Sequence, residues 1–81
     1  MKKVEVQLFA ALTDHFGRNV AVELNGDQKV TGVVNALEKQ NPNAAGLLKD
    51  CRFAVNENFV DLNYELSDGE KIFIIPPSSG G

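Results

Sequence analysis

The residues of this sequence best suited to chemistry are the last two, Gly80 and Gly81, which have no side chains and end in a carboxylate. Glycine has no Cβ, so a Gly-Gly segment can enter a channel that would exclude bulkier residues. A carboxylate is a poor acyl donor, but in an acyl adenylate AMP is a leaving group that sulfur or nitrogen nucleophiles can displace. We therefore expect Gly81 to react, with Gly80 beside it, inside another protein.

The segment Pro76-Pro77-Ser78-Ser79 precedes the two glycines and is expected to contact the same partner. Each proline fixes φ near about −65° and lacks the N–H that a strand ladder needs. A segment that is already extended also loses less conformational entropy when a partner binds it. The sequence therefore predicts a folded domain over residues 1–75 and a flexible tail over residues 76–81.

Side chains elsewhere in the chain do not form a recognisable active site. His15 is the only histidine and Cys51 the only cysteine, so an internal disulfide and a four-cysteine iron–sulfur cluster are excluded. Asp61 and Glu65 are close in sequence, but such acidic pairs usually lie on a solvated surface. No catalytic or metal-binding motif is present. We expect no bound metal or cofactor, and ATP to be used by a partner enzyme.

Length and charge indicate one small domain that works with other proteins. The chain has 81 residues, 43% of them hydrophobic, and a net charge of −3. Its scattered basic residues give no support for nucleic-acid binding, and an acidic domain more often meets a basic protein surface. No apolar stretch approaches the roughly 18 residues of a membrane span, and no signal peptide is visible. These features predict a cytoplasmic protein that binds neither nucleic acid nor membranes.

Hydrophobic periodicity predicts an α+β domain with a mixed sheet of four to five strands and one main helix on one face. Apolar residues alternate at the start of the chain and again before a turn at residues 25–26, which indicates an antiparallel pair. A helical face with period 3.6 runs from Val30 to Leu37 and ends before Pro42, with Asp27 or Thr31 as a possible cap. The predicted strands cover residues 4–10, 20–24, 52–56, 59–60 and 71–75, and short helical turns are expected within 11–18 and 44–50.

The last predicted strand is apolar on both sides. Ile72 and Ile74 point one way, whereas Phe73 and Ile75 point the other. A strand of this kind is either central in its sheet or covered on one side by a partner. We expect the first and last strands to pair in parallel through the middle of the sheet.

Several segments together resemble the MoaD family, the small subunit of molybdopterin synthase. The similar segments are Leu8-Phe9-Ala10 followed by Gly17, the helix from Val30 to Leu37, Ala54-Val55-Asn56, Asp68-Gly69-Glu70, and the ending from Ile75 to Gly81. The resemblance covers essentially the whole chain, and its most specific part is the last fourteen residues. It implies a ubiquitin-like β-grasp fold.

The resemblance also implies a function and a set of partners. Gly81 would be adenylated by an adenylyltransferase related to ubiquitin-activating enzymes and converted to a thiocarboxylate with sulfur from a donor enzyme. The tail would then enter a large catalytic subunit, where sulfur is transferred to cyclic pyranopterin monophosphate. Phe9, Phe73 and Ile75 would form a hydrophobic interface with that subunit, unless they pack in the ordinary core.

The residues leave other functions open. A sulfur carrier for thiamine synthesis or for tRNA thiolation would share the Gly-Gly end, although Pro76 and Pro77 favour the MoaD family. A protein modifier that forms isopeptide bonds with lysine would use the same chemistry up to the nucleophile. A simple interaction domain with an incidental Gly-Gly end is the remaining alternative.

Overall fold

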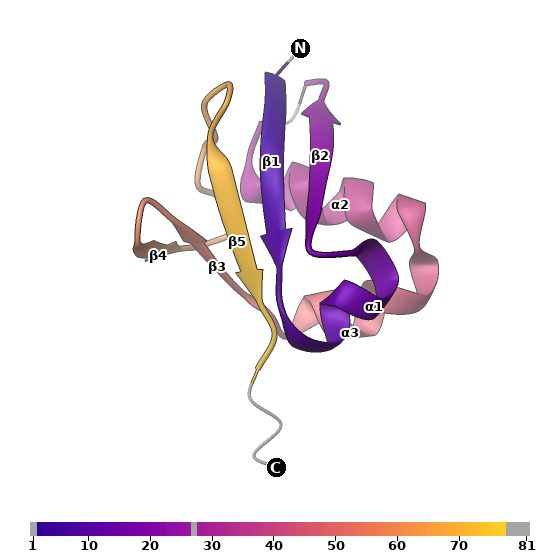
Figure 1. Cartoon of the computed structure of the whole chain (residues 1–81). Helices are drawn as coiled ribbons and strands as arrows, with labels where there is room; N and C mark the ends of the chain where they lie inside the picture. Colours follow the sequence, from indigo (N-terminus) through magenta and orange to yellow (C-terminus); the bar gives the residue numbers. More distant parts are fainter. Residues whose placement is uncertain (1, 27, 78–81) are drawn as a thin grey trace.

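The computed structural model describes residues 2–26 and 28–77 (Figure 1). A single sheet forms its centre, and the strands lie in the order β2-β1-β5-β3-β4. The five strands are β1 (Lys2–Leu8), β2 (Asn19–Leu24), β3 (Arg52–Val55), β4 (Asn58–Val60) and β5 (Lys71–Ile75). The predicted mixed sheet is thus confirmed, at five strands.

The first and last strands pair in parallel at the middle of the sheet, as the sequence predicts. Val6 lies opposite Ile72, and Leu8 lies opposite Ile74. The other pairings are antiparallel: β1 with β2, and β3 with both β5 and β4. The last strand is therefore held on both sides by hydrogen-bonded neighbours.

A short helical connection joins β1 to β2. It consists of the 3-10 helix η1 (Ala10–Leu12) and the helix α1 (Thr13–Phe16). Gly17 ends it with a φ of 77°, a left-handed conformation that favours glycine. The prediction that strand alternation continues to Ala10 is wrong, because β1 ends at Leu8 and Ala10, at a φ of 54°, already belongs to η1.

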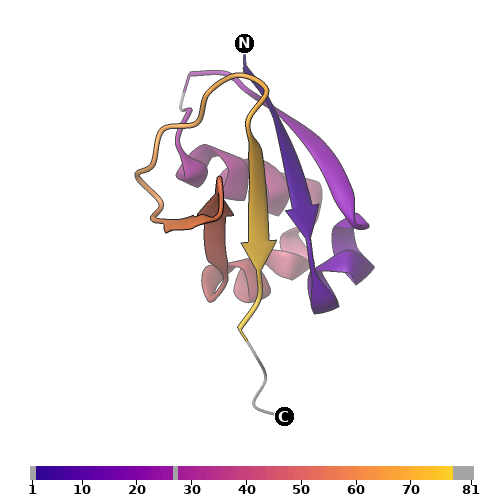
Figure 2. The ribbon, with the colours of Figure 1, turned by 60° about the vertical axis from the view of Figure 1, so that its left-hand side comes forward.

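The main helix, α2 (Val30–Gln40), packs on one face of the sheet, and the views in Figures 1 and 2 agree on this. Its side chains at Val30, Val33 and Leu37 are fully buried, which confirms the predicted apolar face. The 3-10 helix η2 (Pro42–Ala44) and the helix α3 (Ala45–Lys49) follow on the same side. Because α2 and α3 lie on one face, the described part of the chain leaves the other face, here called the open face, without a covering layer.

The start of α2 differs from the prediction. Lys29 occupies the N-cap position without a side-chain capping bond. The Thr31 hydroxyl donates to the carbonyl of Leu62 at 2.8 Å instead of capping the helix, and Asp27 lies outside the described residues. The backbone N–H of Val30 donates to the carbonyl of Tyr64 at 3.0 Å. The segment between β4 and β5 therefore satisfies the donors that a cap would otherwise satisfy.

That segment, residues 61–70, is ordered internally by bonds to the Glu70 carboxylate and is joined to β1 through Asp68. The Glu70 carboxylate accepts the Ser67 N–H at 2.8 Å and, more weakly, the Tyr64 hydroxyl at 3.4 Å. The Asp68 carboxylate accepts the backbone N–H of Lys3 at 2.9 Å, next to the first residues of β1. These bonds set the point at which the chain enters β5.

The core lies between the sheet and the helices, and each strand except β4 contributes buried side chains to it. Val4, Val6, Ile72 and Ile74 are fully buried on the two central strands. Leu37 of α2 is also fully buried and faces the sheet. The arrangement of one main helix across a five-stranded mixed sheet is the β-grasp fold.

We predict that Leu37→Ala lowers the free energy of unfolding by about 2–5 kcal/mol, because it leaves a cavity under the sheet. Urea unfolding followed by circular dichroism measures this change. Leu62→Ala is the matched control, since Leu62 is 47% exposed and its truncation removes little buried area. Equal losses from the two substitutions would contradict the proposed position of the core.

Candidate functional site

The predicted site begins where β5 ends, at Ile75. Pro76 is partly exposed and Pro77 is exposed, so the chain leaves the sheet at this point, as Figure 1 shows. Ser78, Ser79, Gly80 and Gly81 lie outside the described residues. Their predicted roles, in partner contact for the serines and in chemistry for the glycines, therefore stay predictions, as does the predicted boundary of a tail at residue 76.

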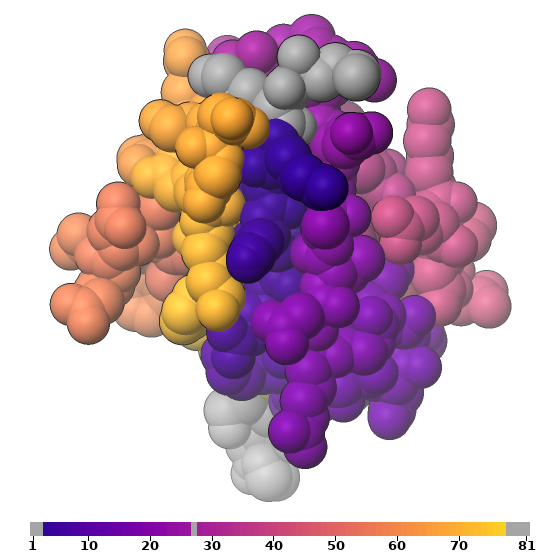
Figure 3. Space-filling view, turned by 45° about the horizontal axis from the view of Figure 1, so that its top comes forward, coloured from indigo at the N-terminus to yellow at the C-terminus, as the bar shows by residue number. Residues whose placement is uncertain are grey.

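A row of side chains crosses the open face beside this point. The strand registers place Gln7 next to Phe73, Phe73 next to Ala54, and Ala54 next to Phe59. Phe73 is 37% exposed and Phe59 is 65% exposed, which leaves two aromatic rings accessible on one surface. In the space-filling view of Figure 3, β1 lies between β5 and β2 without a covering layer. The open face therefore carries an accessible apolar band across β5, β3 and β4.

Phe9, Phe73 and Ile75 all lie outside the buried core. Phe9 follows β1 in an extended conformation, and its ring centroid is 6.0 Å from that of Phe73 at an angle of 51°. Phe9 and Ile75 are both partly exposed. Ordinary core packing is thus not the role of these three side chains. Their contact with a partner stays a prediction. The structure adds that the rings of Phe9 and Phe73 lie next to each other.

Two cations accompany the exposed rings. The Lys71 Nζ is 5.6 Å from the ring centroid of Phe73, and the Arg52 guanidinium carbon is 5.5 Å from that of Phe59. Both distances suit cation–π contacts, which contribute about 0.5–1 kcal/mol at exposed sites. A partner that docks on this face would meet aromatic rings with a positive charge beside each.

Sequence reasoning missed Phe59, Arg52 and Lys71. A sequence signal for Phe59 was available in Asn56-Glu57-Asn58, which is typical of a tight turn, and the structure has positive φ at Asn56 and Glu57, 53° and 67°. Two such residues make the two-residue hairpin turn that places Ala54 directly opposite Phe59. Period-two alternation then puts Phe59 on the exposed face.

The other polar candidates have structural partners. Nδ1 of His15 lies 3.3 Å from the side-chain amide nitrogen of Asn41, which ties α1 to the end of α2. Asp61 accepts the N–H of Asn63 at 2.9 Å in a local turn. Over the described ranges, no group of three or more His, Cys, Asp or Glu side chains could hold a metal ion. No helix within those ranges has the length and apolar character needed to cross a bilayer.

Cys51 is held as a protonated thiol. Its Sγ donates to the carbonyl of Leu47 at 3.2 Å. Partial burial, with a smaller effect from the charge of Asp50, raises the pKa of the Cys51 thiol from 9.0 to about 11. A thiol of this kind is a weak nucleophile near neutral pH, so Cys51 is not suited to carry sulfur.

A β-grasp domain with a Gly-Gly end is the form of the ubiquitin-like class, which includes sulfur carriers and protein modifiers. The chain belongs to the ThiS family, whose model matches residues 6–81. That match includes the Gly-Gly end. No curated protein matches the chain.

Solved structures show the same fold. Small archaeal modifier protein 1 from Methanosarcina acetivorans is 27% identical, with a TM-score of 0.83, over 100% of this chain and 98% of that one. A complex of subunits 1 and 2 of molybdopterin-converting factor from Helicobacter pylori contains a chain 26% identical, with a TM-score of 0.68, over 98% and 99%. The BexX/CysO complex from Amycolatopsis orientalis contains a chain 26% identical, with a TM-score of 0.71, over 96% and 99%.

We predict that iodoacetamide alkylates Cys51 in the folded chain about tenfold more slowly than in the urea-unfolded chain at pH 8, because the raised pKa lowers the thiolate fraction more than it raises the nucleophilicity of the thiolate. Mass spectrometry of timed samples measures both rates. Asp50→Asn removes the smaller cause of the shift and should speed alkylation of the folded chain slightly. Equal rates in the folded and unfolded wild-type chains would contradict the assignment.

Proposed function

We propose that this protein is a sulfur carrier in molybdenum cofactor biosynthesis, acting through Gly81. The observation that carries the proposal is the place where β5 ends, at Ile75. The strand that leads to it, β5, is central in the sheet, and the apolar band of the open face lies beside its last residue. A partner that binds the band would therefore lie close to Ile75, after which the predicted tail begins.

The membership of the ThiS family and the resemblance to the MoaD family support the carrier class. Two of the related structures, from Helicobacter pylori and Amycolatopsis orientalis, contain a second protein, in one case a second subunit of molybdopterin-converting factor. We propose the corresponding partner here, a large catalytic subunit of molybdopterin synthase. It would hold the tail in its active site and contact Phe9, Phe73 and Ile75.

The chemistry starts with ATP in an activating enzyme related to those that activate ubiquitin. The Gly81 carboxylate attacks the α-phosphate, pyrophosphate leaves, and the acyl adenylate forms. Hydrosulfide supplied at a donor enzyme then attacks the Gly81 carbonyl carbon and displaces AMP, which leaves a thiocarboxylate and releases a proton. Within the catalytic subunit that sulfur is transferred to cyclic pyranopterin monophosphate. The chain needs no bound cofactor of its own in this scheme.

The absence of side chains at residues 80–81 suits this sequence of steps. The same carbonyl must fit first the adenylating site and then the synthase site, and glycine offers the least steric conflict in both. The prolines restrict the conformations of the unbound tail, so the tail loses less conformational entropy when it enters either site. On this proposal the tail is a shared substrate for two enzymes.

A protein modifier is the second candidate, favoured by the likeness to small archaeal modifier protein 1. The adenylate would form in the same way, but a lysine amine of a target protein would finally displace the activating group. Carriers for thiamine synthesis and for tRNA thiolation differ only in the acceptor of the sulfur. The acceptor therefore distinguishes these functions.

We predict that incubation with a MoaD-activating adenylyltransferase, ATP and sulfide increases the mass of the chain by the difference between sulfur and oxygen. Intact-mass spectrometry detects this change, and omission of ATP is the control. With the catalytic subunit and cyclic pyranopterin monophosphate added, the mass should return to its original value as molybdopterin forms. A chain that gains no sulfur, or that appears only as conjugates with other proteins, would overturn the proposal.

We predict that one alanine added after Gly81 abolishes sulfur loading, because the added residue removes the Gly81 carboxylate. The melting temperature should stay unchanged, since residue 81 follows the last strand by six positions. Addition of alanine before Met1 is the control and should load normally. Normal loading of the extended C terminus would show that Gly81 is not the reacting residue.

We predict that Phe73→Thr weakens binding of the catalytic subunit by tenfold or more, because it removes the centre of the apolar band. Threonine is well tolerated in strands, and Phe73 is 37% exposed, so the fold should remain. Isothermal titration calorimetry measures the affinity, with Asn35→Ala on the exposed side of α2 as the control. Unchanged affinity for Phe73→Thr would place the interface elsewhere.

A further inference from the structure

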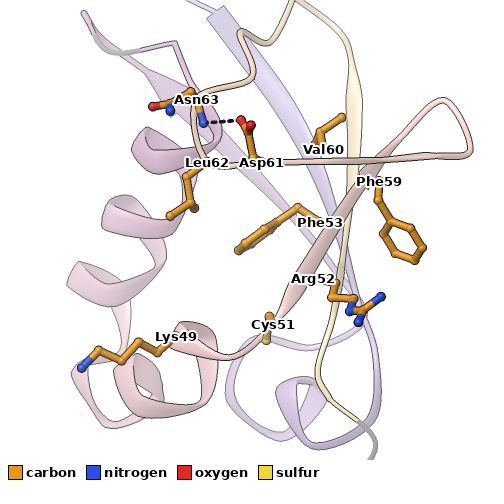
Figure 4. Close-up of a pocket in the computed structure, with 9 residues that line it drawn as sticks. All are labelled: Lys49, Cys51, Arg52, Phe53, Phe59, Val60, Asp61, Leu62 and Asn63. Atoms are coloured by element: carbon orange, nitrogen blue, oxygen red, sulfur yellow. Dashed lines mark hydrogen bonds between the residues drawn. The ribbon is translucent and has the colours of Figure 1, made fainter.

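A groove of about 590 Å³ lies at the edge of the sheet, below the short strand β4. Figure 4 shows its lining: Lys49, Cys51, Arg52, Phe53, Phe59, Val60, Asp61, Leu62 and Asn63. β4 pairs only with residues 53–55 of β3, so the beginning of β3 has no neighbouring strand on this side. The groove therefore crosses the sheet edge from the helical side to the open face.

The groove has an accessible apolar lining. Phe59 is 65% exposed and Leu62 is 47% exposed, and with Phe73 they are the exposed large hydrophobic side chains of the described residues. In Figure 4, Phe53 and Leu62 lie on the helical side of β3, and Phe59 lies on its other side. Apolar area of this kind, left accessible in a small domain, is characteristic of interaction surfaces.

Of the charged side chains that line the groove, Lys49 and Arg52 are positive and Asp61 is negative, although the whole chain carries a net charge of −3. Lys49 and Arg52 have no carboxylate partner in the described part of the chain, and the guanidinium of Arg52 lies over the ring of Phe59. The carboxylate of Asp61 accepts the N–H of Asn63 at 2.9 Å, as the dashed line in Figure 4 shows. Cys51 contributes no negative charge near neutral pH. The two cations are therefore available to a ligand.

The groove is continuous with the surface around the start of the tail. Arg52 lies directly opposite Ile75, the last residue of β5. Arg52 also lies beside the apolar band of the open face, because its guanidinium contacts the ring of Phe59. A protein that encloses the residues after Ile75 while covering this band must therefore come close to the Arg52 end of the groove.

We infer that the catalytic subunit which receives the tail also lays an acidic segment across this groove, with an apolar side chain between Phe59 and Leu62. This inference rests on the proposed function, because it names the chemistry of that subunit at a second surface. Carboxylates of the segment face Arg52 at the open-face end and Lys49 at the helical end. The contact extends the interface from the open face around the sheet edge.

The lining favours a protein segment over a nucleic acid. Two cations are few for a phosphate backbone, whose binding normally draws on many Lys and Arg contacts. An apolar side chain flanked by carboxylates, by contrast, matches both the accessible apolar lining and the separated positive charges. The expectation that a basic partner surface meets this acidic chain does not apply at this local site.

The test measures binding of the thiocarboxylated full-length chain to the catalytic subunit of molybdopterin synthase by calorimetry, at low and high salt. The double variant Lys49→Gln and Arg52→Gln should bind about tenfold more weakly at low salt and show a weaker dependence on salt. Leu62→Asn should weaken binding without changing the salt dependence. Lys39→Gln, which removes an exposed charge from the end of α2, is the matched control and should bind as wild type does.

Two further measurements separate the possible outcomes. Thermal unfolding checks that each variant remains folded, and the rate of thiocarboxylate formation should be the same in all of them. Hydrogen–deuterium exchange should show protection of residues 51–53 and 59–62 in the wild-type complex, which requires no substitution. Wild-type affinity and salt dependence in the double variant, or no protection there, would overturn the inference and leave the proposed function intact.

Two other results also have a definite meaning. If the groove variants slow thiocarboxylate formation but bind the catalytic subunit normally, the groove serves the activating enzyme and the inference is wrong. If the wild-type chain does not bind the catalytic subunit at all, the proposed function fails and the inference fails with it.

Discussion

The parallel pairing of β1 with β5 is the constraint on which the rest of the structure depends. It joins the first and last strands of the fold and so closes a loop of nearly the whole chain. The conformational entropy lost in closing that loop must be offset by the contacts between the two strands. The fully buried Val6 and Ile72, which lie opposite each other, supply part of that offset. Because β5 is central, the residues that follow it begin from a strand that is hydrogen-bonded on both sides and not from an edge strand.

The same strand explains how a small domain combines a core with a docking face. Ile72 and Ile74 are fully buried beneath the helices, while Phe73, between them in sequence, is 37% exposed on the other face. Alternation along one strand thus divides stability and recognition between two surfaces. Substitutions on the open face can therefore change partner choice at little cost in folding free energy.

Periodicity was sufficient to predict most of the fold. The alternating residues of β1, β2 and β5 and the 3.6-residue spacing of α2 each reflect burial on one side, which is a local property of the sequence. The segment 61–70 was not predictable in this way, because its order comes from hydrogen bonds to distant groups, such as Thr31 to Leu62 and Lys3 to Asp68. The tail was singled out by composition alone. Phe59 was missed although the turn before it could be predicted, whereas the groove could not be predicted because its lining combines residues 49–53 with 59–63, which only folding brings together.

The tail and the folded surface have different roles in directing a protein of this class to one pathway. A Gly-Gly end is chemically the same up to the acyl adenylate whether sulfur or a lysine amine follows, so it cannot select the acceptor. Selection must come from groups that differ between carriers, and those lie on the folded domain. Here the candidates are the aromatic band of the open face and the adjoining cations, especially Arg52, which touches Phe59 and lies opposite Ile75. A residue in that position allows a partner to distinguish this domain from others that carry the same Gly-Gly end.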